Sequence, residues 1–99
     1  MSQVGFLVRI QAVPEYADQV ESALRGALEL AREEHGTITW FAFKDGPASF
    51  GVFDTFDDEA GRTAHFEGRI GEVLRGIGPT MFAAVPEISR TDLLAVKLP

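Results

Sequence analysis

The sequence predicts an α+β protein of the ferredoxin-like class, in which helices cover one face of a four-stranded antiparallel sheet. Two observations lead to this fold. Hydrophobic periodicity gives the element order strand, helix, strand, strand, helix, strand. Right-handed crossovers then join these elements into one βαββαβ sandwich. With 99 residues, the chain has the size of a single domain, and we expect residues 1–99 to form it.

Alternating apolar residues predict the first strand over residues 4–13, which Pro14 ends. Helical spacing of apolar side chains predicts a helix over residues 15–34, with Gly36 as the left-handed residue that terminates it. A turn at residues 44–47 is expected next, because its Asp-Gly pair is typical of turns. This turn joins the second and third strands.

The second helical region follows the third strand, and Thr55 or Asp57 can cap its start. Its glycines lie opposite its apolar face. We expect a kink or break near Gly68, because glycine disfavours the helix. Residues 76–79, which are rich in glycine and proline, are expected to end the helical region, and residues 88–98 to form the last strand.

The hairpin over residues 37–56 is apolar on both of its faces. Trp40 and Ala42 belong to one alternating set of side chains, and Phe41 and Phe43 belong to the other. A half-buried strand has one polar set instead, because successive side chains point to opposite faces. A chain this short has helices for one face only. We therefore expect a second copy of the chain to cover the other face, giving a homodimer.

Composition excludes several classes of function. A net charge of −6 argues against nucleic acid or an anionic membrane surface as a partner, because both need clustered Lys and Arg. The absence of cysteine excludes disulfides, thiolate metal sites and cysteine nucleophiles. No apolar run approaches the ~20 residues of a membrane-spanning helix. The N-terminal sequence lacks the pattern of a signal peptide, so we expect a cytoplasmic protein.

His65 is the first candidate for catalysis. It lies on the flank of the second helical region, where a polar side chain can reach the space between helix and sheet. A neutral imidazole in that space can move a proton at physiological pH. The alternative is a helix-surface or hydrogen-bonded core histidine. His35 is explained by the favourable charge at a helix C-terminus. The two histidines lack metal-ligand spacing, so we predict no metal site.

Asp54 is the second candidate. It shares strand parity with Phe50 and Val52, so its carboxylate should point into apolar surroundings. A charge buried there needs a partner. Arg9 or Arg62 would make Asp54 half of a structural ion pair, and the alternative is a catalytic acid or base.

Several short motifs fit one known family. Glu34-His35-Gly36 matches a Glu-x-Gly that precedes the second strand, and residues 53–56 take the place of an aromatic-Glu-x-Trp strand, with Asp for Glu and Phe for Trp. Asp58-Glu59-Ala60 leads to His65 at the family spacing. Over nearly its whole length the chain thus resembles the antibiotic biosynthesis monooxygenase superfamily of dimeric α/β-barrel proteins. Its closing residues 94–99, with Arg62 and His65, resemble a branch of quinol-type monooxygenases.

The resemblance implies two sheets packed face to face into a barrel. It also implies a pocket where a small phenolic or quinol-type aromatic meets oxygen without a metal, flavin or other cofactor. His65 or Asp54 would be the base, and Trp40 and Phe53 would exclude water and position the ring. The haem-degrading branch needs an asparagine, which this chain lacks, so haem degradation is not expected.

Other interpretations of these residues stay open. Arg9 and Arg62 are further candidates for substrate contact, whereas Trp40 also fits a core or dimer-interface position. Folds of this type host unrelated functions. The alternative to an enzyme is therefore a non-catalytic dimeric protein, stress-associated or binding small molecules, that uses the same pocket.

Overall fold

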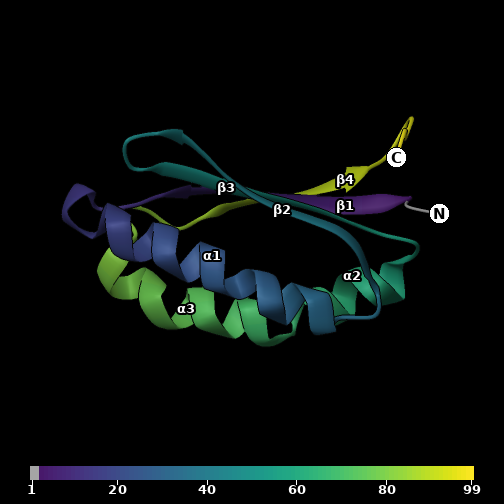
Figure 1. Cartoon of the computed structure of the whole chain (residues 1–99), viewed down its shortest axis with the longest axis horizontal. Helices are drawn as coiled ribbons and strands as arrows, with labels where there is room; N and C mark the ends of the chain where they lie inside the picture. The colour runs from purple at the N-terminus through teal and green to yellow at the C-terminus, as the bar shows by residue number, and fades with distance from the viewer. Residues whose placement is uncertain (1–2) are drawn as a thin grey trace.

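The computed structural model describes residues 3–99. They form an antiparallel sheet with a layer of helices on one face (Figure 1). The sheet has the strand order β2-β3-β1-β4. Its strands are β1 (Val4–Gln11), β2 (Thr37–Gly46), β3 (Ser49–Phe56) and β4 (Glu87–Asp92). The helices are the short 3-10 helix η1 (Pro14–Tyr16), α1 (Ala17–Glu33), α2 (Glu59–Phe66) and α3 (Arg69–Met81). The predicted ferredoxin-like α+β fold is confirmed.

The core lies between the helix layer and the inner face of the sheet. On β3 the inward side chains of Phe50, Val52 and Phe56 are buried, because alternate residues of a strand share one face. Helix α1 lies against this surface with Val20 and Leu24 buried. Its other buried positions are alanines, whose small side chains let the helix approach the sheet closely.

The predicted break in the second helical region is confirmed. Helix α2 ends at Phe66, and α3 begins at Arg69 after Gly68, which is extended at the N-cap. The cap of α2 is Asp58, neither Thr55 nor Asp57. The Asp58 carboxylate accepts a hydrogen bond of 2.9 Å from the backbone N–H of Gly61. Asp58 holds this position because it directly precedes the first helical residue.

Three predicted boundaries were wrong. Helix α3 continues through Pro79 to Met81, because a proline in the last turn removes only one intrahelical hydrogen bond. Strand β4 ends at Asp92, and Leu94 beyond it is 98% exposed. The hairpin turn lies at Pro47 and Ala48, since Gly46 still pairs with Ser49.

The expected left-handed glycine is absent. No glycine among residues 3–99 has a positive φ, so Gly36 does not terminate α1 in a left-handed conformation. The helix ends instead because Glu34, its C-cap residue, is extended with φ −87° and ψ 107°. An extended residue cannot continue the helical hydrogen-bond ladder. The chain turns towards β2 there, and Glu34 projects from the corner.

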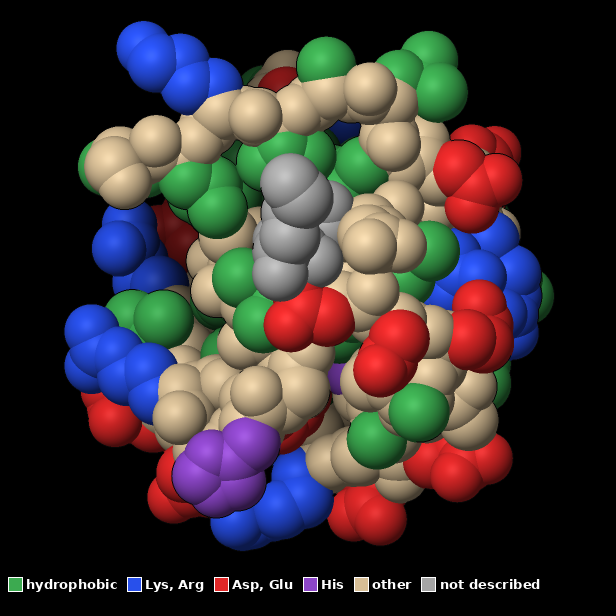
Figure 2. Space-filling model, turned by 90° about the vertical axis from the view of Figure 1, so that its right-hand side faces the viewer, with side chains coloured by type: hydrophobic (Ala, Val, Ile, Leu, Met, Phe, Trp, Pro, Cys, Tyr) green, Lys and Arg blue, Asp and Glu red, His purple; other side chains and the backbone are tan. Residues whose placement is uncertain are grey.

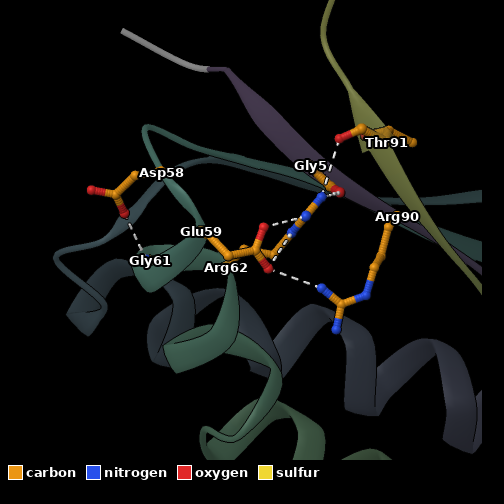
Figure 3. Close-up of polar contacts among 7 residues, drawn as sticks. All are labelled: Gly5, Asp58, Glu59, Gly61, Arg62, Arg90 and Thr91. Atoms are coloured by element: carbon orange, nitrogen blue, oxygen red, sulfur yellow. Dashed lines mark hydrogen bonds and ion pairs between the residues drawn. The ribbon is translucent and has the colours of Figure 1, made fainter.

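Arg62 joins α2 to the sheet (Figure 3). Its buried guanidinium donates hydrogen bonds of 3.3 Å to the carbonyl of Gly5 on β1 and 3.2 Å to that of Thr91 on β4. It also pairs with the carboxylate of Glu59. Arg90 contacts the same carboxylate at 3.0 Å. Arg62 is therefore a structural clamp between one helix and two strands.

The outer face of the sheet carries exposed apolar side chains. Phe41 is 57% exposed there, and Phe43, Phe53 and Leu7 on the same face are partly exposed. Helices α1, α2 and α3 lie on the opposite side of the sheet (Figure 1). The hairpin is therefore apolar on both faces, as its sequence predicted. No helix among the described residues is long and apolar enough to cross a membrane.

Replacing Arg62 by methionine tests the clamp. The substitution keeps a long apolar side chain but leaves the carbonyls of Gly5 and Thr91 without their charged donor. We expect the free energy of unfolding to fall by about 2–3 kcal/mol, measured as a lower midpoint of urea unfolding. Arg25→Met on the exposed face of α1 is the matched control and should shift the midpoint far less. Equal shifts of the urea midpoint in the two variants would contradict the role of Arg62 as a structural clamp.

Candidate functional site

Asp54 lies at the centre of the sheet with its carboxylate among apolar groups. It is 1% exposed, and its register partners are Phe6 on β1 and Trp40 on β2. The inward position follows from strand parity, because Phe50 and Val52 on the same strand point the same way. The sequence therefore placed this carboxylate correctly on the buried face.

The partner of Asp54 is His65 on α2, and the predicted arginine partners were wrong. His65 Nε2 lies 2.8 Å from Asp54 Oδ2. Arg9 lies on the outer face of the sheet and pairs with Asp45 at 2.5 Å, because strand parity sends its side chain away from the helices. Arg62 is occupied by backbone carbonyls and Glu59.

His65 and Asp54 lie in close contact, and they form an ion pair when the imidazole is protonated. Asp54 Oδ1 has no hydrogen-bond donor among the described residues, whereas Oδ2 lies 2.8 Å from His65 Nε2. Catalytic hydrogen bonds are often poorly aligned before a substrate binds. A small rotation of the carboxylate would align it with Nε2 and leave Oδ1 free.

Glu34 holds the other side of the imidazole. His65 Nδ1 lies 2.5 Å from Glu34 Oε1, and the hydroxyl of Thr37 donates a hydrogen bond of 2.8 Å to the same oxygen. Asp54, His65 and Glu34 therefore form a continuous row, named here the Asp54–His65–Glu34 row. The side chains of His65 and Glu34 are 10% and 22% exposed. The row runs from the interior towards the surface.

Sequence reasoning did not select Glu34 as a site residue. The available signal was its place in Glu34-His35-Gly36, a motif that precedes the second strand. Glu34 and His65 are 31 positions apart, and they meet because the corner after α1 lies beside α2. Gly36 allows this approach, since a Cβ added there would lie 3.2 Å from the Cα of Gly61 on α2.

Two opposing effects set the pKa of His65. Burial by itself lowers the pKa, because it disfavours the charged imidazolium. The carboxylates of Asp54 and then Glu34 outweigh burial and raise the pKa of His65 above its ordinary value. The ring also packs against Phe56, with centroids 5.2 Å apart. The imidazolium is thus the favoured form over a wider pH range than in a free histidine.

A cavity of about 490 Å³ opens beside Asp54 and His65. Its volume lies within the roughly 300–1,000 Å³ typical of ligand sites. Most of its lining is apolar and comes from the inner face of the sheet, from α2 and α3, and from the segment before β4. The principal apolar contributors are Phe6, Val52, Phe66, Ile70, Leu74 and Phe82. An apolar ring of modest size fits such a space.

The other candidate residues lie away from this cavity. Trp40 packs against the core beneath α1, with its Nε1 buried and unpartnered among the described residues. Phe53 and Arg9 lie on the outer face of the sheet. Arg62 belongs to the clamp. The aromatic walls come instead from Phe6, Phe66 and Phe82, which the sequence analysis did not assign to the site.

No group of three or more ligating side chains placed to hold a metal ion occurs among residues 3–99. The Asp54–His65–Glu34 row has its histidine between two carboxylates, an arrangement suited to holding or moving a proton.

Figure 2 shows the end of the molecule where α2 and the corner after α1 lie, with charged side chains of both signs around it.

Comparison with solved structures places the chain in a family. The NE2512 protein of Nitrosomonas europaea, a protein of unknown function, matches with a TM-score of 0.97. The two sequences are 44% identical over 100% of this chain and 96% of that chain. This chain belongs to the NE2512 family. No family model and no curated protein matches it.

The NE2512 family shares its fold with more distant proteins. Rv0793 of Mycobacterium tuberculosis matches with a TM-score of 0.85 at 12% identity, over 96% of this chain and 98% of that chain. A structure named antibiotic biosynthesis monooxygenase matches with a TM-score of 0.81 at 18% identity, over 93% and 99% of the two chains. The predicted resemblance to the antibiotic biosynthesis monooxygenase superfamily is confirmed at the level of the fold.

The raised pKa of His65 predicts how stability depends on pH. A histidine whose pKa is raised by folding stabilises the protein fully below its unfolded value of about 6.5, and this contribution is lost as the pH rises through the folded-state value. The stability advantage of the wild type over His65→Gln should therefore shrink with rising pH in urea unfolding. His35→Gln controls for the loss of a histidine as such. A stability difference between the wild type and His65→Gln that does not change with pH would contradict a raised pKa of His65.

Proposed function

We propose that this protein is a monooxygenase that oxidises a small phenolic or quinol-type aromatic without a metal or flavin. The observation that carries the proposal is the Asp54 and His65 pair in the wall of an apolar cavity of about 490 Å³. The shared fold with antibiotic biosynthesis monooxygenase proteins supports the same reaction class. The cavity supplies a dry space for a ring, and the pair supplies the proton chemistry.

The reaction requires an electron-rich substrate. Asp54 takes the proton of the substrate hydroxyl on Oδ1, which has no donor among the described residues. The phenolate formed then reacts with O₂. One oxygen atom enters the ring, the C–H bond breaks, and the second oxygen atom leaves as water. A phenol and one O₂ thus give a quinone and one water, so the substrate itself supplies the electrons.

Each part of the site has a role in this scheme. Proton abstraction by a positioned carboxylate accelerates such a step by typically 10²- to 10⁴-fold. The apolar walls exclude water from the oxygen-reactive intermediate. Arg75, which lines the cavity, carries the positive charge available to a phenolate. The substrate predicted by this lining is a flat apolar ring with one hydroxyl directed at Asp54.

We further propose that the working unit is a homodimer formed through the outer face of the sheet. Phe41, Phe43 and Phe53 make an apolar surface there, and Phe41 is 57% exposed. Phe43 lies over Gly51, where an added Cβ would come 2.2 Å from the ring. The ring thus covers the glycine and flattens the face. Two such faces in contact would bury these rings.

Oxygen uptake tests the proposed reaction. With a panel of hydroquinones, Asp54→Asn and His65→Ala should each consume O₂ about 10²-fold more slowly than the wild type, measured with an oxygen electrode. Asp45→Asn, on the other side of the sheet, is the matched control and should retain full uptake. Unchanged uptake in His65→Ala would remove His65 from the mechanism.

The same panel separates an enzyme from a binding protein. An enzyme turns over the ligands that stabilise it. Ligands that raise the melting temperature by mass action but consume no O₂ at any pH would favour the alternative, a non-catalytic protein that binds small molecules in the same cavity.

Dimer formation has its own test. Phe41→Asp places a charge among the apolar side chains of the outer face, and burying it unpaired is costly. We expect this variant to sediment as a monomer at concentrations where the wild type is a dimer. Val73→Asp, at an exposed position on α3 in the helix layer, is the control and should remain dimeric. A wild-type monomer in dilute solution would overturn the proposal.

A further inference from the structure

The Asp54–His65–Glu34 row connects two separate hollows of the molecule. Asp54 and His65 line the apolar cavity of about 490 Å³. A second hollow of about 340 Å³ lies at the corner between α1 and β2, and its lining includes both Glu34 and His65. His65 therefore lies between the two hollows, with one ring nitrogen directed at each carboxylate.

We propose that Glu34 is the outer end of a proton relay that links Asp54 to solvent through the two nitrogens of His65. The proposal rests on the proposed function, because it gives the row a part in that reaction. Its geometry is independent of the reaction: the two heavy-atom separations are 2.8 Å and 2.5 Å, both within reach of proton transfer. The 22% exposure of the Glu34 side chain opens the row to water.

His65 is the side chain in the cavity that can accept this proton from Asp54. Among its described lining residues, the ionisable side chains are Asp54, His65 and Arg75, and arginine is not deprotonated in proteins. An aromatic ring in the cavity would displace water from beside Asp54. The imidazole is then the neighbouring group that can carry the proton away.

The outward transfer moves one proton from the substrate to solvent in three steps. The substrate hydroxyl gives its proton to Asp54. Rotation of the Asp54 carboxyl group brings the protonated Oδ1 to Nε2 of a neutral His65 that carries its hydrogen on Nδ1. The proton then moves to Nε2, and the imidazolium forms. The imidazolium then gives its Nδ1 proton to Glu34, which releases it to solvent. His65 is left with its hydrogen on Nε2, and one proton has left the cavity.

The inward transfer restores the starting state. Reduction of O₂ to water requires protons at the reacting oxygen. Glu34 takes a proton from solvent and gives it to Nδ1, and the imidazolium then gives its Nε2 proton to Asp54 and so to the departing oxygen. The imidazole again carries its hydrogen on Nδ1. The imidazolium is the intermediate in both directions, and the two flanking carboxylates stabilise it.

Charged side chains approach His65 from several elements of the fold. Asp54 faces it from β3, and Glu34 faces it from the end of α1. The other charged or titratable groups of the outer hollow are Glu33, His35 and Arg69. Glu33 lies 3.6 Å from Arg69, and both side chains are largely exposed. Glu33 therefore differs from Glu34 in having no contact with the imidazole, which makes it a matched control.

The probe for the relay is 4-nitrophenol, which becomes coloured when it loses its proton. Stopped-flow absorbance measures how fast the phenolate appears after mixing with the protein at a pH where the free phenol is mostly protonated. We expect Glu34→Gln to slow this phase about tenfold or more and Glu33→Gln to leave it unchanged. Imidazole buffer should restore the rate in Glu34→Gln, because a small base reaching His65 can replace the missing carboxylate.

Rescue by buffer separates a relay from a structural role, since buffer cannot repair a distorted site. Glu34→Ala is the second variant and should show the same loss and the same rescue. An unchanged rate in Glu34→Gln, or a slow rate that imidazole does not restore in either variant, would overturn the relay. The assay uses no oxygen. If hydroquinones consume no O₂ while ionisation still depends on Glu34, the proposed function fails and the relay stands.

Discussion

The burial of the Asp54 carboxylate constrains the rest of this structure. A charge in the middle of an apolar core is stable only with a partner, and here the partner comes from the helix layer. His65 supplies it at 2.8 Å. Helix α2 lies where its imidazole reaches β3, and α2 and α3 together form part of the cavity wall.

Helix α2 has only eight residues, too few to be stable by itself. Three contacts outside its own hydrogen-bond ladder hold it in place: the Asp58 cap at its start, the Arg62 clamp to β1 and β4, and the His65 contacts to Asp54 and Glu34. Arg62 and His65 are three positions apart and so lie on neighbouring parts of one face. One fixes the helix to the backbone of the sheet, and the other brings the proton-carrying group to the cavity.

Periodicity was sufficient to predict the element order, the break near Gly68, the two-sided hairpin, and Asp54 and His65 as candidates. Periodicity could not show that Asp54 and His65 contact each other. Strand parity placed Asp54 inward, but the same rule placed Arg9 on the outer face, where it meets Asp45. Arg62 was taken by backbone carbonyls that no side-chain pattern reveals. Glu34 was missed because its contact with His65 depends on how a corner and a helix come together, and hydrophobic spacing carries no information about that.

The proposed function gives the Asp54–His65–Glu34 row a role that stability alone does not require. Replacing a buried ion pair by well-packed apolar residues is often neutral or stabilising, so stability alone gives little reason for a carboxylate at this position. The second carboxylate oxygen of Asp54, Oδ1, also has no donor among the described residues, whereas Oδ2 contacts His65. The unsatisfied acceptor lies beside a cavity large enough for an aromatic ring. In the proposed function, the hydroxyl group of a substrate in that cavity is the donor to this oxygen.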